Sequence, residues 1–372
     1  MNKTKLLYVH YKGNLVGTLA LTPDNKVAFE YDDDWITNGF SISPFSLPLE
    51  KRVFIPTKSH FNGLFGVFAD SLPDAWGNIL LNRVLKQNGI IPEHLNSLER
   101  LAIVGSSGMG ALSYEPSKQL HAIPTQIDLD NLAFECKNIL YSHPSKSLDE
   151  LYRLGGISGG ARPKIMTNID NQEWIIKFPA HMDDANIGLM EYEYSLCAKK
   201  CGITMTETRL FPSKNCDGYF GIERFDIINN NRLHTLTVAA LLELNFEEPN
   251  LDYHTLMKLT KIITADNKSD LENMFRRMCF NVFAHNRDDH SKNFSFIYDE
   301  SKDIWRLSPA YDLTYSTTYY GEHTTSINNN GTDPSIHDLL QVGLQAGMKK
   351  ATCLSIIEEI QVTVHNDLGK YL

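Results

Sequence analysis

The sequence predicts an α+β protein in which a β-rich N-terminal domain precedes a two-lobed body. Short strand patterns separated by turn residues open the chain, and a glycine-rich turn followed by further strand patterns occupies its middle. Helical apolar spacing prevails from Thr237 onward. These shifts predict three consecutive parts, namely an N-terminal domain at residues 1–120, a small lobe at 121–226 and a mainly helical large lobe at 227–372.

The composition is that of a globular protein, with 42% apolar and 22% charged residues in 372. The formal net charge of −10 argues against unaided binding to nucleic acid or to an anionic membrane. No apolar run approaches the roughly 20 residues of a membrane span. The six cysteines are scattered without zinc or disulfide spacing, which predicts reduced thiols. A cytoplasmic protein without membrane attachment is therefore expected.

The first part of the chain reads as a sheet followed by a packing segment. Strand patterns at residues 6–11, 15–21 and 27–31 are separated by turn residues. The aromatic-rich stretch 61–77 is interpreted as buried core rather than chemistry. Three glycines between Gly105 and Gly110 lack the Lys-Ser/Thr ending and the helix of a phosphate loop, so that interpretation is rejected. The polar, proline-bearing stretch 116–150 is the expected seam after this domain.

A second glycine-rich turn carries the first chemical signal. Residues 155–164 contain glycines, an arginine and a lysine, which let backbone amides and cations approach a polyphosphate. The candidate phosphate-loop residues are Ser158, Gly159, Gly160, Ala161, Arg162 and Lys164. An apolar strand pattern then ends at Lys177, and in nucleotide phosphotransferases such a lysine reaches the phosphates and pairs with a glutamate of the next helix. Glu193 and Glu191 are the candidate partners, and Glu193 is preferred.

Two more strand patterns, 207–211 and 219–225, are joined by an Asp-Gly turn. In a two-lobed kinase the segment after the last small-lobe strand offers backbone groups to adenine. The hinge candidates are Glu223, Arg224 and Phe225.

The most polar stretch, residues 285–293, follows a helix pattern and precedes a strand pattern. Asp288 precedes Asn293 by five positions, the interval between a catalytic aspartate and a metal-binding asparagine in kinase-type phosphotransferases, whereas Asp289 does not fit it. A carboxylate can accept the proton of an attacking hydroxyl, and an amide oxygen can hold magnesium. A solvated loop that caps a helix is the alternative for a charge cluster taken alone.

The stretch after this loop completes the pattern. A hairpin pattern at 294–307 is followed by Asp312, where kinases keep a second magnesium carboxylate, although a single aspartate in a loop is more often a turn former. Residues 315–335 are rich in Thr, Ser, Asn and Gly and are expected to form a mobile surface loop. Two closing helices, broken near 343–347, are expected at 339–368.

Taken together, these motifs resemble the HipA family of serine/threonine protein kinases, the toxin components of bacterial HipB/HipA-type modules. The likeness runs nearly end to end. The motifs that carry it are Phe68-Ala69-Asp70-Ser71-Leu72-Pro73-Asp74-Ala75-Trp76-Gly77, Gly108-Met109-Gly110-Ala111-Leu112, Gly159-Gly160-Ala161-Arg162-Pro163-Lys164, Ile176-Lys177-Phe178-Pro179, Glu223-Arg224-Phe225-Asp226, Asp288-Asp289-His290-Ser291-Lys292-Asn293-Phe294-Ser295 and Ala310-Tyr311-Asp312-Leu313.

The resemblance implies a two-lobed kinase fold with an added N-terminal domain, and ATP and Mg²⁺ as cofactors. It implies that Asp288 is the catalytic acid/base, that Asn293 and Asp312 bind magnesium, and that Lys177 binds the ATP phosphates. His290 and Lys292 would line the nucleotide site. Some members phosphorylate an aminoacyl-tRNA synthetase, and they are restrained by a small HipB-like helix-turn-helix antitoxin that carries the DNA binding.

One position departs from the family pattern. Members that inactivate themselves by autophosphorylation carry a serine seven places before the loop lysine, and Ile157 stands there in this chain. Either Ser158 takes that role from the next position or the protein is not regulated in this way. Two other functions stay open, namely a small-molecule kinase that shares the same core and a nucleotide-binding regulatory pseudokinase. The ordered set Lys177, Asp288, Asn293 and Asp312 argues against the pseudokinase.

Overall fold

The opening strand patterns form one antiparallel sheet with the order β4-β3-β2-β1-β5. The structure is a computed structural model and describes residues 4–118, 128–156, 159–180, 183–318 and 320–372. The strands are β1 (Leu6–Tyr11), β2 (Asn14–Leu21), β3 (Val27–Tyr31), β4 (Val53–Phe54) and β5 (Leu112–Glu115). Lys12 and Gly13 both take positive φ, +49° and +84°, which closes the β1–β2 hairpin tightly. The three predicted strands are confirmed.

The chain divides into two compact units. The first comprises Met1–Gly188, Phe211–Leu236 and Ala240–Glu243, and the second comprises Leu189–Leu210, Thr237–Ala239 and Leu244–Leu372. The elements that contain residues of both units are α7 (Ile187–Lys200), β8 (Thr208–Phe211), β12 (Thr235–Thr237) and α8 (Val238–Leu242). The expected part boundaries at residues 120 and 226 stay predictions.

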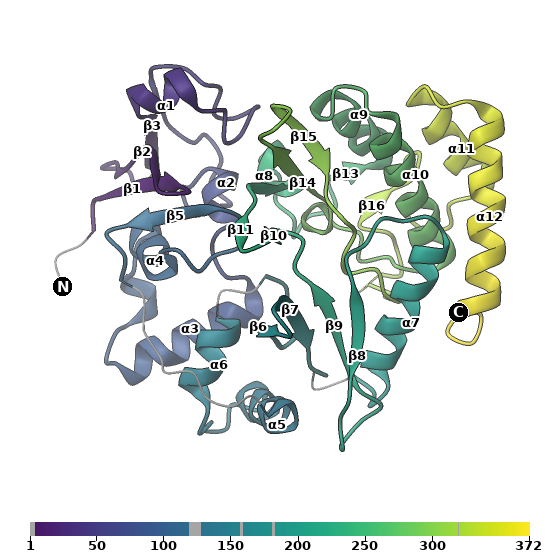
Figure 1. The fold of residues 1–372 in the computed structure, drawn as a ribbon, viewed down its shortest axis with the longest axis horizontal. Helices are drawn as coiled ribbons and strands as arrows, with labels where there is room; N and C mark the ends of the chain where they lie inside the picture. Colours follow the sequence, from purple (N-terminus) through teal and green to yellow (C-terminus); the bar gives the residue numbers. More distant parts are fainter. Residues whose placement is uncertain (1–3, 119–127, 157–158, 181–182, 319) are drawn as a thin grey trace. The chain divides into compact units, whose positions relative to one another are not determined.

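Within the first unit, one apolar core joins helices to a second sheet, in which β6 (Lys164–Ile169) and β9 (Tyr219–Glu223) both pair antiparallel with β7 (Gln172–Lys177). The core contains buried side chains from helices α3 to α6, including Trp76 of α3, Ile103 of α4, Cys136 of α5 and Leu151 of α6. The stretch expected as a seam therefore carries two helices that share this core. The remaining elements of the unit are α1 (Asp33–Asn38), α2 (Gly66–Ala69), α3 (Ala75–Gln87), η1 (Pro92–His94), α4 (Ser97–Val104), α5 (Leu129–Leu140), α6 (Leu148–Gly155), β10 (Ile227–Ile228) and β11 (Asn231–Arg232), most of them visible in Figure 1.

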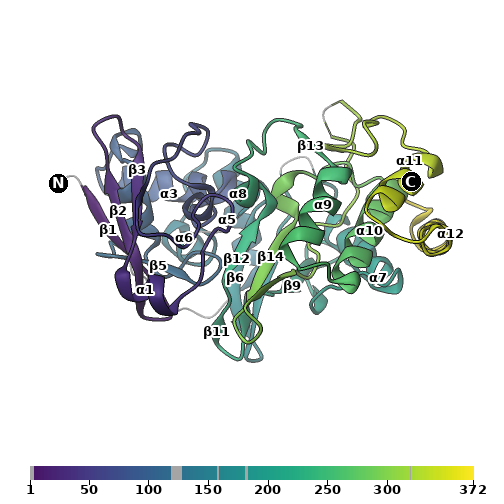
Figure 2. The same cartoon turned by 90° about the horizontal axis from the view of Figure 1, so that it is seen from above.

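The second unit is mainly helical. Its helices include α9 (Tyr253–Ile263), α10 (Lys268–Phe283), α11 (Ile336–Gln345) and α12 (Lys350–Leu368), and α10 packs against both α9 and α12 (Figure 2). Met274 and Met278, which stand at helical spacing four positions apart, are fully buried on α10. The break between α11 and α12 confirms the two closing helices. The remaining elements are β13 (Leu251–Asp252), η2 (Ser291–Asn293), β14 (Ser295–Asp299), β15 (Ile304–Leu307) and β16 (Thr325–Ser326).

All six cysteines are free thiols, as their spacing predicts. In the described part of the chain, no helix combines the length and the apolar character needed to cross a bilayer.

Candidate active site

The polar loop at residues 285–293, called the catalytic loop below, lies in the second unit between α10 and the β14–β15 hairpin. His285 takes a positive φ of +51° directly after the end of α10, which turns the chain out of the helix. The 3₁₀ turn η2 then leads into β14, and the side chain of His290 caps it by accepting from the Lys292 amide at 3.2 Å. A helix end and a capped turn therefore fix both ends of a short loop.

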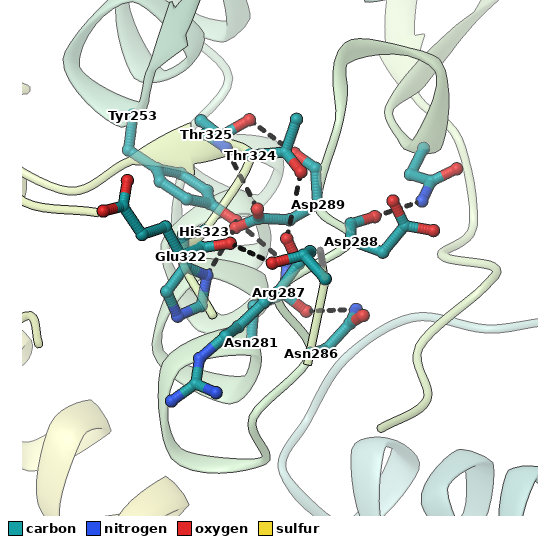
Figure 3. A network of polar contacts seen from close by, with 12 residues as sticks. Tyr253, Asn281, Asn286, Arg287, Asp288, Asp289, Glu322, His323, Thr324 and Thr325 are labelled. Carbon is teal, nitrogen blue, oxygen red and sulfur yellow. Dashed lines mark hydrogen bonds and ion pairs between the residues drawn. The ribbon is translucent and has the colours of Figure 1, made fainter. Parts of the chain in front are cut away.

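The two adjacent aspartates of the loop have opposite environments. The side chain of Asp288 is 57% exposed, whereas that of Asp289 is fully buried. The side-chain nitrogen Nδ2 of Asn293 donates to the backbone carbonyl of Asp288 at 2.6 Å, so the two ends of the five-residue interval are joined directly. Figure 3 shows Asp288 on the opposite side of the loop from Tyr253 and His323, which surround Asp289. Only Asp288 can meet a substrate without unfolding its surroundings.

Asp312 lies against the catalytic loop. The amide nitrogen of Asn286 donates to the Asp312 carbonyl at 3.3 Å, and the Tyr311 hydroxyl donates to the Lys292 carbonyl at 2.7 Å. Asp312 has a φ of +54°, which is uncommon outside glycine and is concentrated at functional sites. The structure thus places the backbone of Asp312 beside the loop that carries Asp288 and Asn293.

The Asn293 and Asp312 side chains fit a magnesium ion by their chemistry. Carboxylate and amide oxygens are the ligands that Mg²⁺ prefers, and it commonly binds one or two protein groups while phosphates and water complete its octahedron. Among the residues that the structure describes, no group of three or more His, Cys, Asp and Glu could hold a metal by itself. A metal shared with a phosphate ligand is the kind of site that this donor set suits.

The two remaining candidates of the catalytic loop, His290 and Lys292, both lie near the ring of Phe246. The Lys292 ammonium lies 4.4 Å from the centre of the Phe246 ring, and the His290 ring lies 5.8 Å from the same ring. The His290 Nε2 atom is 3.9 Å from Asp288 Oδ1. No sequence signal identifies Phe246, because a lone aromatic residue in a turn-rich stretch is ordinary.

A buried network surrounds Asp289. Its carboxylate accepts from the Tyr253 hydroxyl at 2.9 Å and from the Thr325 amide at 3.0 Å, and His323 Nδ1 lies 3.0 Å from it. Burial, and then the neighbouring Asp289 charge, raise the pKa of Tyr253 well above its usual value. Burial, followed by the nearby Arg287 and His323 charges, lowers the pKa of His285.

The network changes the interpretation of residues 315–335, which were expected to form a mobile surface loop. Ser316 forms a parallel bridge with Asn286, the Thr324 amide donates to the Arg287 carbonyl at 3.0 Å, and Thr325 is fully buried. Ser316 and residues 323–325 therefore bond polar groups of the catalytic loop, whereas other polar residues of the stretch, such as Thr332 and Asp333, are exposed as expected. Sequence reasoning missed Tyr253, His323 and Thr325.

In the first unit, the glycine-rich turn is held from α3. The Gly160 amide donates to Asp74 Oδ2 at 3.0 Å, and the Trp76 amide donates to the Gly160 carbonyl at 3.3 Å. Gly160 has a φ of +83°, so this turn depends on glycine. Ser158 lies outside the described residues. The packing role predicted for the stretch 61–77 accounts for buried Trp76, but the contact between Asp74 and the loop was missed.

The cations of this loop have defined places. The Lys164 ammonium donates to the Gly159 carbonyl at 2.6 Å, and Arg162 pairs with Asp183 at 3.2 Å, while Ala161 is exposed. Lys177 ends β7 directly opposite Lys164 in the β6–β7 register. Its ammonium lies 5.6 Å from the centre of the Phe220 ring. The structure therefore gathers the candidate phosphate-loop cations at one end of one strand pair.

Glu193 has partners of its own in the second unit. Its carboxylate lies 2.6 Å from both the Lys370 ammonium and the Tyr371 hydroxyl. Burial acts to raise the pKa of Glu193, but the bonds from Lys370 and Tyr371 outweigh it and the pKa is lowered. Glu191, the other candidate, is buried on the same helix. The pairing of Lys177 with Glu193 or with Glu191 stays a prediction.

Of the hinge candidates, Glu223 is the last residue of β9, and Arg224 and Phe225 follow that strand. The guanidinium of Arg224 forms a bidentate, buried pair with Asp226 at 3.0 and 2.8 Å, so its side chain is structural, and its amide donates to the Glu173 carbonyl at 2.8 Å. Glu223 and Phe225 are both half-buried. Asp226 also accepts from the Gly110 amide at 2.8 Å, which agrees with rejecting that glycine-rich stretch as a phosphate loop.

Comparisons with known proteins match both the N-terminal and the C-terminal parts of the chain. A family model described as the HipA N-terminal domain matches residues 7–115, and the HipA-like C-terminal domain matches residues 157–368. A chain of the Shewanella oneidensis MR-1 toxin–antitoxin complex of HipA, HipB and operator DNA has a TM-score of 0.72 and 18% identity, covering 98% of this chain and 90% of its own. The protein named Putative kinase Y4dM of Sinorhizobium fredii is 23% identical over 359 residues, 88% of this chain and 81% of its own.

The fold and the site define a class: a kinase-like α+β protein that carries an additional N-terminal domain, as the sequence predicts. Because the C-terminal family model covers more than half of the chain and the N-terminal model precedes it, the chain belongs to the HipA family.

Proposed function

We propose that this protein is an ATP- and Mg²⁺-dependent kinase that transfers the γ-phosphate of ATP to a serine or threonine hydroxyl of a protein. One observation carries the proposal: Asp288, Asn293 and Asp312 are gathered on one short loop and its neighbour, and Asp288 is the aspartate that faces outward. The name of the relative Putative kinase Y4dM supports the same activity.

Asp288 would act as the acid/base. Its carboxylate orients the attacking hydroxyl and accepts its proton while the hydroxyl oxygen bonds to the γ-phosphorus. The bond from that phosphorus to the β,γ-bridging oxygen breaks, and ADP leaves with the bonding electron pair. Most of the rate enhancement comes from positioning and from charge stabilisation, since phosphoryl transfer asks for little covalent chemistry from the protein.

The other residues would hold the nucleotide. Asn293 and Asp312 present oxygens to magnesium, which neutralises phosphate charge when it is bound. In the first unit, the glycine-rich turn and Lys177 bind the phosphates, and backbone groups of residues 223–225 bind adenine. His290 and Lys292 line the nucleotide site from the catalytic loop.

The variant Asp288→Asn tests the activity. We expect phosphate transfer from labelled ATP to fall about 10²- to 10⁴-fold, because the amide cannot accept the proton. Thermal stability should change by less than about 0.5 kcal/mol because the side chain is exposed. Asp266→Asn, a matched change at a carboxylate that is 62% exposed, should leave transfer unchanged.

The acceptor is identified in the same assay. Incubation with labelled ATP, magnesium and cell extract should label a specific protein with wild-type enzyme and not with Asp288→Asn. By family resemblance, an aminoacyl-tRNA synthetase is the first acceptor to test. Label confined to small molecules would replace the proposal with a small-molecule kinase, and an absence of ATP turnover would replace it with a regulatory pseudokinase.

We also propose a HipB-type helix-turn-helix partner, through which the protein contacts DNA only indirectly. The match over 98% of this chain to a chain from a complex of HipA, HipB and operator DNA supports this partner, and the net charge of −10 disfavours direct DNA binding. A helix-turn-helix protein encoded beside this one should co-elute with it in gel filtration. An operator fragment should shift only when both proteins are present, and a shift by this chain alone would contradict the proposal.

A further inference from the structure

We propose that Asp289 is a positioning residue that holds residues 322–326, called the strap below, against the catalytic loop and thereby fixes where Asp288 and Asp312 lie. This inference rests on the phosphotransfer function proposed above. Asp289 does not touch substrate in this scheme. It acts through the backbone that it shares with Asp288 and through a chain of buried hydrogen bonds (Figure 3).

The first step is the cost of burying this carboxylate. A fully buried charge is unfavourable unless hydrogen bonds compensate for its lost hydration. Asp289 is fully buried and is met by Tyr253, His323 and the Thr325 amide, and its own carbonyl accepts from the Thr325 hydroxyl. Two of these partners belong to the strap. The lost hydration of the Asp289 carboxylate is therefore fully compensated by hydrogen bonds only when the strap is in place.

The second step is that the hydrogen-bond network continues from Asp289 to the backbone of Asp312. The side-chain nitrogen Nδ2 of Asn281 donates to the Tyr253 hydroxyl at 2.9 Å. The side-chain nitrogen Nδ2 of Asn286 donates to Asn281 Oδ1 at 2.9 Å. The same Asn286 nitrogen donates to the Asp312 carbonyl. Tyr253, Asn281 and Asn286 are all at most 2% exposed. An unbroken buried path thus joins the strap to the backbone of Asp312.

The third step is that the strap is anchored on its other side. β16 pairs in parallel with β13, and the Ser326 hydroxyl donates to Asp252 Oδ2 at 2.7 Å. Asp252 also caps the start of α9 by accepting from the His254 amide at 2.8 Å. The strap is therefore clamped between a helix terminus and the catalytic loop, and it can transmit a fixed position from one to the other.

The test compares Asp289→Asn with wild type in the full chain. The asparagine amide keeps the shape of the side chain but places an N–H donor opposite the Tyr253 hydroxyl and His323. At least one buried donor of the network then has no acceptor. We expect kcat for phosphate transfer to fall about 10- to 100-fold, as for a small misplacement of reacting groups. The KM for ATP should change by less than about threefold, because the nucleotide contacts are kept. Hydrogen exchange of residues 322–326 should accelerate.

A second pair of variants covers the case in which Asp289→Asn does not fold. His323→Asn retains a donor near the position of Nδ1, whereas His323→Leu has none. We expect His323→Asn to keep both turnover and exchange protection, and His323→Leu to lose both. Equal losses in the two variants would indicate a purely structural role and would overturn the inference. Unchanged turnover and unchanged exchange in Asp289→Asn and His323→Leu would also overturn it.

The outcome is separable from that of the proposed function. Asp288→Asn should lower transfer about 10²- to 10⁴-fold, as stated above, while leaving hydrogen exchange of the strap unchanged. If wild-type protein transfers no phosphate, the kinase proposal fails, and the exchange measurements still decide whether Asp289 holds the strap to the loop. If wild-type protein is active and Asp289→Asn retains its kcat, the positioning inference fails while the kinase proposal stands.

Discussion

The adjacent residues Asp288 and Asp289 have different roles because the Asp288 side chain is exposed to solvent and the Asp289 side chain is buried. Asp289 is compensated by three hydrogen-bonding groups in the protein interior, whereas Asp288 remains accessible. The spacing to Asn293 selects Asp288 from the sequence. No local signal predicts the burial of Asp289, since its partners lie 34 to 36 positions away in either direction.

At the residue scale, Glu243 makes stability depend on pH. Burial raises its pKa from 4.5 to about 6, although the Gly66 amide donates to its carboxylate. A folded-state pKa above the unfolded value means that its stabilising contribution is present below about pH 4.5 and is lost as the pH rises through 6. After allowance for partial exposure, we expect the free energy of unfolding to fall by about 1 kcal/mol between pH 4.5 and 7 because of this group.

Urea denaturation at a series of pH values measures this effect. Glu243→Gln keeps an acceptor for the Gly66 amide and cannot ionise, so its unfolding midpoint should fall less over the same range. Identical pH profiles for the two proteins would show that Glu243 ionises normally.

At the scale of elements, the glycine-rich turn depends on α3 as well as on its own sequence. Asp74 and Trp76, at the start of α3, bind both the amide and the carbonyl of Gly160. The turn is therefore held by a helix that lies 86 positions earlier. The phosphate-loop prediction came from local composition, and the way the loop is held came from this distant contact.

Gly160→Ala tests the turn. A φ of +83° costs an alanine about 1–2 kcal/mol, and its methyl group would lie 2.6 Å from the Lys164 ammonium, which must move. We expect the Kd for ATP, measured by calorimetry, to rise about tenfold, which corresponds to about 1.4 kcal/mol. The matched change Gly159→Ala has no positive φ and meets only Asp74 at 3.2 Å, so its effect should be smaller. Wild-type ATP affinity in both variants would contradict a role for this turn.

Elements with strong local patterns were predicted well, including β1 to β3, α10 and the β14–β15 hairpin. Periodicity and turn residues act over a few positions, so they are visible in the sequence. Residues 323–325, within the expected surface loop 315–335, were misinterpreted because polar composition is shared by solvated loops and by segments that bond a polar loop. Only the buried states of His323 and Thr325 distinguish the two cases.

At the scale of the molecule, the N-terminal domain shares a hydrophobic core with the rest of the first unit. Its α3 contributes Trp76, Leu80, Leu81, Val84 and Leu85 to the core that α5, α6 and the β6–β7 pair complete. Burial of five such side chains contributes on the order of 10 kcal/mol to the free energy of unfolding, which is comparable with the net stability of a whole domain. We expect a variant lacking residues 1–115 to show no cooperative thermal transition by circular dichroism.

A matched pair inside α3 serves as the control. Leu81→Ala removes a side chain that is 1% exposed and should cost about 2–5 kcal/mol, whereas Ile79→Ala, at 38% exposure, should cost far less. If the shortened chain unfolds at the wild-type temperature, the shared core does not stabilise the unit.

The sequence by itself determined the elements with strong local patterns, such as β1 to β3 and α10, and the spacing that singles out Asp288, Asn293 and Asp312, because these features depend on residues close together in the chain. Only the tertiary structure decided that Asp289 is buried, that Asp74 holds the glycine-rich turn and that residues 322–326 clamp the catalytic loop. Each of these depends on hydrogen bonds between groups 34 or more positions apart. Such bonds form only after folding has removed both partners from water.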